Sequence, residues 1–140
     1  MKSNLNEYGL TAGLLLLFMA IAHAIYGETV VFTDLQFMTF DRNLFTAVYV
    51  PWHQMSLVLI ISAIGLIISS FRKEHRSIHA FVLLLIFSNL VILTIALING
   101  SSFGNATSLL AFQTWPQFFF FLTLTLLITL GLLKKEKSRE

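Results

Sequence analysis

The amino-acid sequence predicts an all-α integral membrane protein, a four-helix antiparallel bundle with both termini in the cytoplasm. The first supporting observation is composition: of 140 residues, 56% are apolar and 11% are charged. An ordinary soluble domain carries about 25% charged residues. This chain has too few charged side chains to cover a water-exposed surface of its size, which excludes the soluble, disordered and fibrous classes.

The second observation is the position of the charges. No charged residue occurs within 8–27, 43–71 or 77–133. A helix needs about 20 apolar residues to cross the hydrocarbon core, so the first two stretches fit one span each and the third fits two. Long unbroken apolar runs favour helices over barrel strands, in which polar and apolar residues alternate. We therefore predict one transmembrane domain, 1–140, with helices near 8–27, 47–71, 78–98 and 116–133, outer loops 28–46 and 99–115, and a cytoplasmic loop 72–77.

The third observation is the asymmetry of the basic residues. With four spans, both termini and loop 72–77 share one side, and together they hold 8 of the 9 Lys and Arg residues, leaving Arg42 on the other side. The positive-inside rule then predicts a multi-pass protein of the cytoplasmic membrane with both termini inside. The basic pI of 9.2 follows from this topology. The lipid bilayer is therefore the expected partner, and nucleic acid is not.

The two prolines bear on where helices begin. A capping-box pattern surrounds Pro116, which predicts that the last helix starts there with the proline in its first turn. Pro51 leaves two alternatives open. It lies near the first turn of a helix that begins near Tyr49, or it kinks a helix that begins at Asp41.

Polar and small residues of a membrane helix are expected to turn towards the other helices. On the third helix this predicts an inward face that carries Ser88, Asn89 and Ile92. Asn89 is also the one strongly polar residue near the midplane of the predicted spans, where no carboxylate or lysine occurs. A proton relay across the membrane is therefore disfavoured. The run Phe118–Phe121 cannot face the bundle as a whole, and most of it is expected to face lipid or a partner.

Two ionisable side chains fall well inside predicted spans, and both are histidines. His23 and His53 come from consecutive helices, and each lies within about 10 Å of the outer boundary at 1.5 Å per residue. Glu28 follows the first helix at the same level. Ionisable residues at membrane depth point to a functional site. We therefore take His23, His53 and Glu28 as candidate metal ligands, and we take as candidate cofactor-binding residues His23, His53, Trp52 and Trp115.

This cluster leaves several chemistries open. Two imidazoles and a carboxylate suit a divalent metal ion, two histidines from facing helices suit the iron of haem b, and the same groups suit a quinone or lipid with polar ends. Alternatively, the histidines hydrogen-bond only each other, a backbone carbonyl or water. Because His23 and Glu28 are five residues apart, a shared site requires the chain to turn at Gly27.

Other functions are compatible with the same sequence. The protein is alternatively an accessory subunit of a larger membrane complex or a homo-oligomer, with the phenylalanine run as the contact surface. An enzyme acting on a lipid or quinone, with His53 as acid or base, is a third possibility, although no catalytic motif is identified. The absence of cysteine removes disulfides and thiolate chemistry. Loop 28–46 is a candidate lid over the histidines, and His79 is expected at the cytoplasmic boundary of the third helix.

Three short segments carry a family resemblance: A-H-x-x-x-G-E at 22–28, W-H-x-x-S at 52–56 and W-P at 115–116. In these segments the chain resembles a group of small, uncharacterised four-helix bacterial membrane proteins. In that group an arginine and a histidine commonly precede the last W-P. Residues 111–114 contain neither an arginine nor a histidine. If these two residues form part of a site in that group, this chain lacks that part. The resemblance implies a bacterial inner membrane and no activity.

Overall fold

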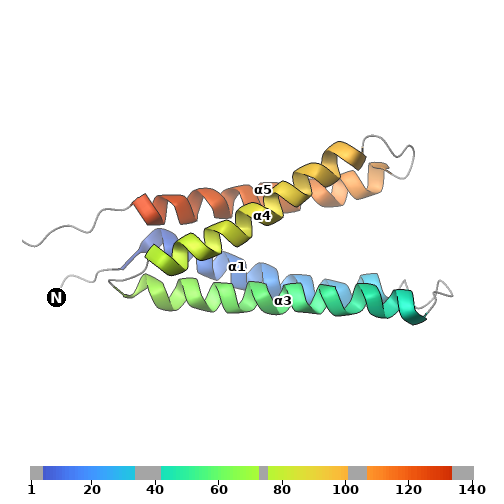
Figure 1. The fold of residues 1–140 in the computed structure, drawn as a ribbon, viewed down its shortest axis with the longest axis horizontal. Helices are drawn as coiled ribbons and strands as arrows, with labels where there is room; N and C mark the ends of the chain where they lie inside the picture. Colours follow the sequence, from blue (N-terminus) through green and yellow to red (C-terminus); the bar gives the residue numbers. More distant parts are fainter. Residues whose placement is uncertain (1–4, 34–41, 73–75, 101–106, 134–140) are drawn as a thin grey trace, which may run out of the picture.

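The computed structural model describes residues 5–33, 42–72, 76–100 and 107–133, and this part of the chain is all-helical. Four of its helices are long and apolar enough to cross a membrane, through segments Glu7–Val31, Phe45–Ser70, Arg76–Ile95 and Pro116–Leu133. The predictions of an all-helical fold and of four helices able to span a membrane are confirmed. The elements, drawn in Figure 1, are α1 (Glu7–Tyr26), the π-helical segment η1 (Gly27–Val31), α3 (Arg42–Ser70), α4 (Arg76–Gly100) and α5 (Thr107–Leu133).

Two helices begin earlier than the sequence predicted. α3 begins at Arg42 instead of residue 47, and α5 begins at Thr107 instead of Pro116, so both prolines lie inside helices. The alternative with Pro51 inside a longer helix is therefore the one observed. A proline removes one N–H donor from the helix, but membrane-spanning helices tolerate this loss. The predicted start of the last helix, at Pro116, was wrong because the leucine- and alanine-containing segment before it also favours helix.

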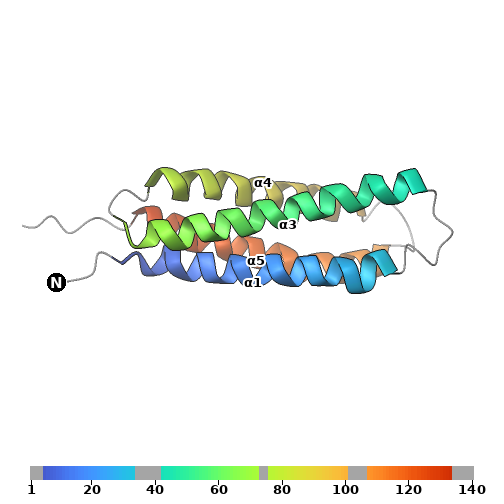
Figure 2. The same cartoon turned by 90° about the horizontal axis from the view of Figure 1, so that it is seen from below.

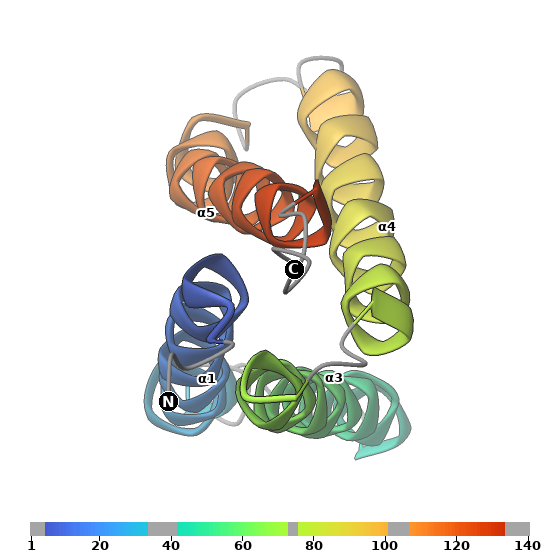
Figure 3. The same cartoon turned by 90° about the vertical axis from the view of Figure 1, so that its left-hand side faces the viewer.

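The helices associate in two pairs. Figures 1 and 3 show α1 beside α3 and α4 beside α5, and these two pairs make the most extensive contacts. Figure 2 shows all four helices running along the same long axis. Contacts between α3 and α4 are fewer, because α4 approaches α3 near the connection between them and diverges from it further along (Figures 1 and 3). Each helix contributes one buried face to the core, with members three or four residues apart: Ala12, Leu16 and Ala20; Leu59, Ala63 and Leu66; Val82, Ile86 and Leu90; and Phe121, Leu124 and Ile128.

The inward face of α4 differs from the predicted one. Ser88 is exposed, Ile92 is 62% exposed and Asn89 is half-buried, whereas Ile86 and Leu90 face the core. Ser88 needs no inward partner, because its hydroxyl donates to the carbonyl of Leu84 in its own helix at 2.8 Å. Small polar residues that bond their own backbone are therefore poor markers of the buried face in this chain.

Asn6 joins three helices at one end of the molecule. Its side-chain oxygen accepts the backbone N–H of Gly9 at 3.1 Å and so caps α1. Its own backbone N–H donates to the carbonyl of Ser70 at 2.9 Å, and its Nδ2 donates to the carbonyl of Gly131 at 3.0 Å. These bonds bring the start of α1 to the ends of α3 and α5. We call this the Asn6 end.

His79, at the start of α4, is fully buried at the same end. Its Nδ1 lies 3.3 Å from the hydroxyl of Ser69, and its ring packs directly against Gly9. His79 does lie at the start of its helix, as expected, but the sequence did not indicate that its side chain is buried. Gly9 on α1 leaves room for the imidazole of His79. This fit between the two residues cannot be predicted from either position in the sequence.

Candidate functional site

The opposite end of the α1–α3 pair is shaped by the π-helical segment. A site shared by His23 and Glu28 would require the chain to turn at Gly27. The chain instead continues there as a helix, in which the N–H of Phe32 bonds the carbonyl of Gly27 five residues earlier. In a π-turn, residues five apart approach one face, and Gly27 and Phe32 are both buried. Glu28, between them in sequence, lies at the edge of α3. We call this the Glu28 end.

Gly27 allows α1 and α3 to approach each other here. A Cβ atom built on Gly27 would collide with the indole of Trp52, closest to its Nε1. The indole can therefore lie flat against α1, where it stacks on the imidazole of His23 with ring centroids 4.2 Å apart and an interplanar angle of 11°. Its Nε1–H also donates to the carbonyl of His23 at 3.1 Å.

The imidazole of His23 is held by a second residue of α3. Its Nδ1 lies 2.9 Å from the hydroxyl of Ser56, and that hydroxyl donates to the carbonyl of Trp52 at 3.1 Å. A serine hydroxyl has one hydrogen, so when that hydrogen goes to Trp52, Nδ1 of His23 must supply the hydrogen of the other bond. The network therefore assigns the Nδ1-protonated tautomer to His23.

His53 takes part in a separate polar contact. Its Nε2 lies 3.0 Å from Oε1 of Glu28, and the hydroxyl of Tyr49 donates to the same oxygen at 2.8 Å. The Nε2 atom is buried, and within the described residues it has no hydrogen bond of good geometry despite the short distance to Glu28. The side chains are 28% exposed for His53 and 52% exposed for Glu28. One carboxylate oxygen thus carries two contacts, and the group stays open on one side.

Phe32 forms the floor of this group. Its ring is 1% exposed and contacts four rings of α3: Phe45, Tyr49, Trp52 and His53, with centroid separations of 5.7, 4.7, 5.8 and 5.6 Å. These contacts hold the start of the predicted outer loop against α3. Residues 34–41, the centre of the candidate lid, lie outside the described part. We call the set Glu28, Phe32, Tyr49, Trp52 and His53 the Glu28 cluster.

The structure brings together some of the predicted site residues and separates others. His53 meets Glu28, whereas the imidazole of His23 is occupied by Ser56 and Trp52. In the described ranges, no group of three or more His, Cys, Asp or Glu side chains is placed to hold a metal ion. Trp115, the fourth candidate cofactor-binding residue, lies in α5, but its side chain is not among those that the structure describes.

Sequence reasoning missed three contributors to this end of the molecule. Tyr49 and Ser56 were not among the candidate site residues, and Phe32 lies in the segment predicted as outer loop 28–46. Spacing offered a partial signal, because Tyr49 precedes His53 by four residues and Ser56 follows Trp52 by four, so each pair shares a helix face. Nothing in the sequence indicated the π-turn that buries Phe32.

Comparison of the chain with protein-family models, curated proteins and solved structures finds no match. Within the described part, its class therefore follows from its own geometry: an all-helical protein with four helices able to span a membrane. The feature that distinguishes it is a polar and aromatic cluster between two of these helices at one end.

Proposed function

We propose that the protein is a multi-pass protein of a bacterial cytoplasmic membrane, an antiparallel four-helix bundle with both termini inside. The basic residues support this orientation, since 8 of 9 occur in the termini and in loop 72–77. The hydrogen bonds from Asn6 to Ser70 and Gly131 support it too. They place the start of α1 beside the ends of α3 and α5, as expected if α1 is antiparallel to both. The Glu28 end then belongs to the outer leaflet.

We propose further that the Glu28 cluster binds the polar head of a molecule dissolved in that leaflet, of the quinone or lipid class. The observation that carries this proposal is the contact between Glu28 and His53. It lies at the end of a span, and it retains hydrogen-bonding capacity at the buried Nε2 atom and at the half-exposed carboxylate. Ionisable groups next to hydrocarbon lower the stability of a membrane protein, so their presence there points to a function.

The surroundings of this contact suit an amphipathic ligand. Phe32, Tyr49 and Trp52 supply aromatic surface beside the polar pair, and tyrosine and tryptophan are amphipathic residues that favour the membrane interface. A binding site with apolar walls and a few convergent polar groups is the usual form of a small-molecule site. A quinone carbonyl or a lipid headgroup presents an acceptor to the N–H of the His53 imidazole.

Quenching of Trp52 fluorescence tests this proposal. A Trp115→Phe background leaves Trp52 as the sole tryptophan, and the two probes are ubiquinone-1 and a phosphatidylglycerol with brominated acyl chains. We expect saturable quenching by one of them. We expect the affinity to fall about tenfold or more in His53→Ala, because a hydrogen bond to a charged or polar site residue is lost.

Thr29→Ala is the matched control, because Thr29 lies in η1 but its hydroxyl bonds the carbonyl of Ile25 and it is exposed. Quenching that does not saturate, or that is equal in His53→Ala and the control, would contradict the proposal. The expectations of a bound metal ion or haem and of an accessory role in a larger complex stay predictions.

A further inference from the structure

Two arginines lie at the Asn6 end, where α3 ends and α4 begins. Arg72 follows α3, and its backbone N–H bonds the carbonyl of Ser69 at 3.0 Å, whereas Arg76 is the first residue of α4. The Ser69 hydroxyl lies 3.3 Å from Nδ1 of His79, so the end of α3 and the start of α4 are side by side (Figure 3). Each arginine is three residues from this contact, on its outer side.

The two guanidinium groups lie within reach of one ligand. Three residues separate Arg72 from Arg76, so their Cα atoms are at most about 14 Å apart, the span of four residues of extended chain. Both side chains are exposed, and among the described residues neither forms an ion pair. A guanidinium keeps its charge and offers five N–H donors. Such a pair without a carboxylate partner is complementary to an anion.

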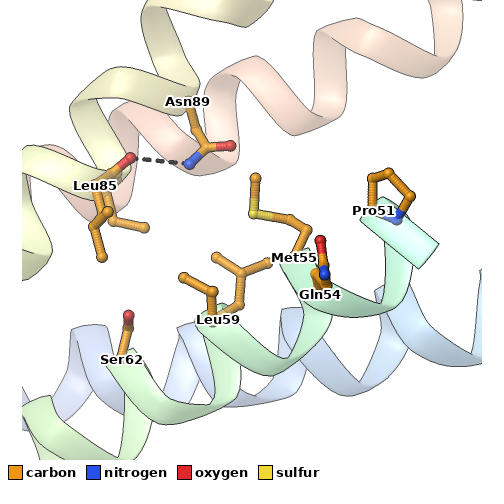
Figure 4. A pocket seen from close by; sticks show the side chains of 9 residues that line it. Pro51, Gln54, Met55, Leu59, Ser62, Leu85 and Asn89 are labelled. Atoms are coloured by element: carbon orange, nitrogen blue, oxygen red, sulfur yellow. Dashed lines mark hydrogen bonds between the residues drawn. The ribbon is translucent and has the colours of Figure 1, made fainter. Parts of the chain in front are cut away.

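An apolar stripe on the surface of α3 leads up to Arg72. Its members are three or four residues apart and between 45% and 68% exposed, and the last lies in the turn that ends the helix: Ile61, Ile64, Ile68 and Phe71. This spacing places them opposite the core residues Leu59, Ala63 and Leu66. We call them the Phe71 stripe. None of them lines the half-open groove of about 270 Å³ between α3 and α4, which Figure 4 shows.

The first turn of α4 stands beside the Phe71 stripe. A Cβ atom built on Gly65 would lie 3.5 Å from Cγ2 of Ile78. Gly65 is four residues after Ile61 and three before Ile68, so it neighbours both on the surface of α3. Arg76 precedes Ile78 by two residues. A chain-like ligand that lies along the stripe therefore has both arginines at one of its ends.

This arrangement matches the shape and charge of an anionic phospholipid. Arg72 follows the span Phe45–Ser70 by two residues, and Arg76 begins the span Arg76–Ile95, so both lie at the level where headgroups meet hydrocarbon. Acyl chains cover the stripe, and a phosphate at their polar end meets the guanidinium groups. A zwitterionic headgroup adds a cation, which the arginines repel, whereas an anionic headgroup carries none.

We propose that Arg72 and Arg76 hold the phosphate of an anionic phospholipid of the phosphatidylglycerol type, with an acyl chain along the Phe71 stripe. This goes beyond the function of the Glu28 cluster, which lies at the opposite end. It rests on the proposed placement of the Asn6 end in the cytoplasmic leaflet, whose anionic lipids attract basic residues. A protein that does not enter bilayers would contradict that placement, whereas one that enters them without lipid selectivity would contradict this inference alone.

A tryptophan beside Arg72 tests the proposal. Phe71→Trp, combined with Trp52→Phe and Trp115→Phe, is reconstituted in phosphatidylcholine bilayers. Quenching by phosphatidylglycerol with brominated acyl chains, compared with equally brominated phosphatidylcholine, gives the relative affinity at this position. We expect a preference of about fivefold or more for phosphatidylglycerol, the factor that one arginine near an anionic lipid contributes. Val50→Trp is the matched reporter, because Val50 is exposed near the other end of α3, and it should show no preference.

Two double variants with the same change in charge test whether the arginines form the site. Arg72→Gln with Arg76→Gln should lower the preference at the Phe71→Trp reporter by about fivefold or more. Lys134→Gln with Lys135→Gln removes two positive charges that follow α5 and should leave most of the preference. Equal losses in the two double variants would assign the preference to the net charge of this end and would overturn the proposal.

Three further results would also overturn it. These are no preference at the Phe71→Trp reporter in protein that has entered the bilayer, an equal preference at the Val50→Trp reporter, and displacement of phosphatidylglycerol by millimolar glycerol 1-phosphate. The last result would show that a soluble phosphate, and not a lipid, is the ligand of the arginines.

Discussion

Trp52 binds His23 twice, by stacking on its imidazole at 4.2 Å and by donating a hydrogen bond to its carbonyl oxygen at 3.1 Å. Both contacts come from one side chain of α3 to one residue of α1. They set the distance and the register of the two helices at the Glu28 end. Because Glu28 and Phe32 follow Gly27 closely, the same contacts determine which residues of α3 they meet.

The first prediction concerns the space at Gly27. Gly27→Ala forces a Cβ into the indole of Trp52, and overpacking of this kind costs about 1–3 kcal/mol. Thermal unfolding of the detergent-purified protein, followed by circular dichroism, measures the loss. Gly65→Ala is the control, since its Cβ would lie 3.5 Å from Cγ2 of Ile78, an ordinary contact. Equal stability of the two variants would show that α1 and α3 do not approach as described.

The second prediction concerns the hydrogen of His23. The serine hydroxyl donates to Trp52, so His23 should be protonated at Nδ1 when neutral. Nitrogen-15 NMR of histidine-labelled protein reports the tautomer. In Ser56→Ala the Nδ1 proton loses its acceptor, and we expect the tautomer signal to change and stability to fall by about 1–3 kcal/mol. An Nε2-protonated His23 in the unmodified protein would contradict the network.

The third prediction concerns the fit of Gly9 to His79 at the Asn6 end. Gly9→Ala should destabilise the protein by about 1–3 kcal/mol, because the added Cβ collides with Nε2 of the buried imidazole and comes within 2.7 Å of the Ser70 hydroxyl. A double-mutant cycle with His79→Ala measures the coupling. Gly9→Ala should cost clearly less in the His79→Ala background. Additive effects would place the strain elsewhere.

The fourth prediction tests the metal or haem site. If His23, His53 and Glu28 act as ligands, protein purified in detergent should contain about one zinc, copper or haem iron per chain, or take one up when it is supplied. Elemental analysis and a visible spectrum measure this. His53→Ala should remove the metal, while His79→Ala, at the opposite end, should not. A colourless protein that acquires none of these would end this prediction.

Composition and charge spacing identified the four spans well. The predicted last span, 116–133, coincides with the apolar segment Pro116–Leu133 of α5. The ends towards the Glu28 end were less accurate, because α3 and α5 continue beyond their apolar windows through Pro51 and Pro116. The rule that proline ends or breaks a helix was derived from soluble proteins, and both prolines of this chain lie inside helices.

The candidate site was predicted in part. Glu28 and His53 meet, but His23 packs with Ser56 and Trp52 instead of joining them. A membrane helix is apolar on all sides, so its pattern identifies its buried face poorly. Asn89 illustrates the difficulty, because it was assigned to a packing face and lines the groove between α3 and α4 instead.

By itself, the sequence determined four segments long and apolar enough to span a membrane, and it located the ionisable residues within them. These properties depend on the cost of charge in hydrocarbon, which acts on each segment separately. Only the tertiary structure decided which side chains meet. That depends on rotation and register between helices, which are set here by close contacts at Gly27 and Gly9 and by the π-turn before Phe32. Helix packing is a pairwise property, and neither helix of a pair encodes it alone.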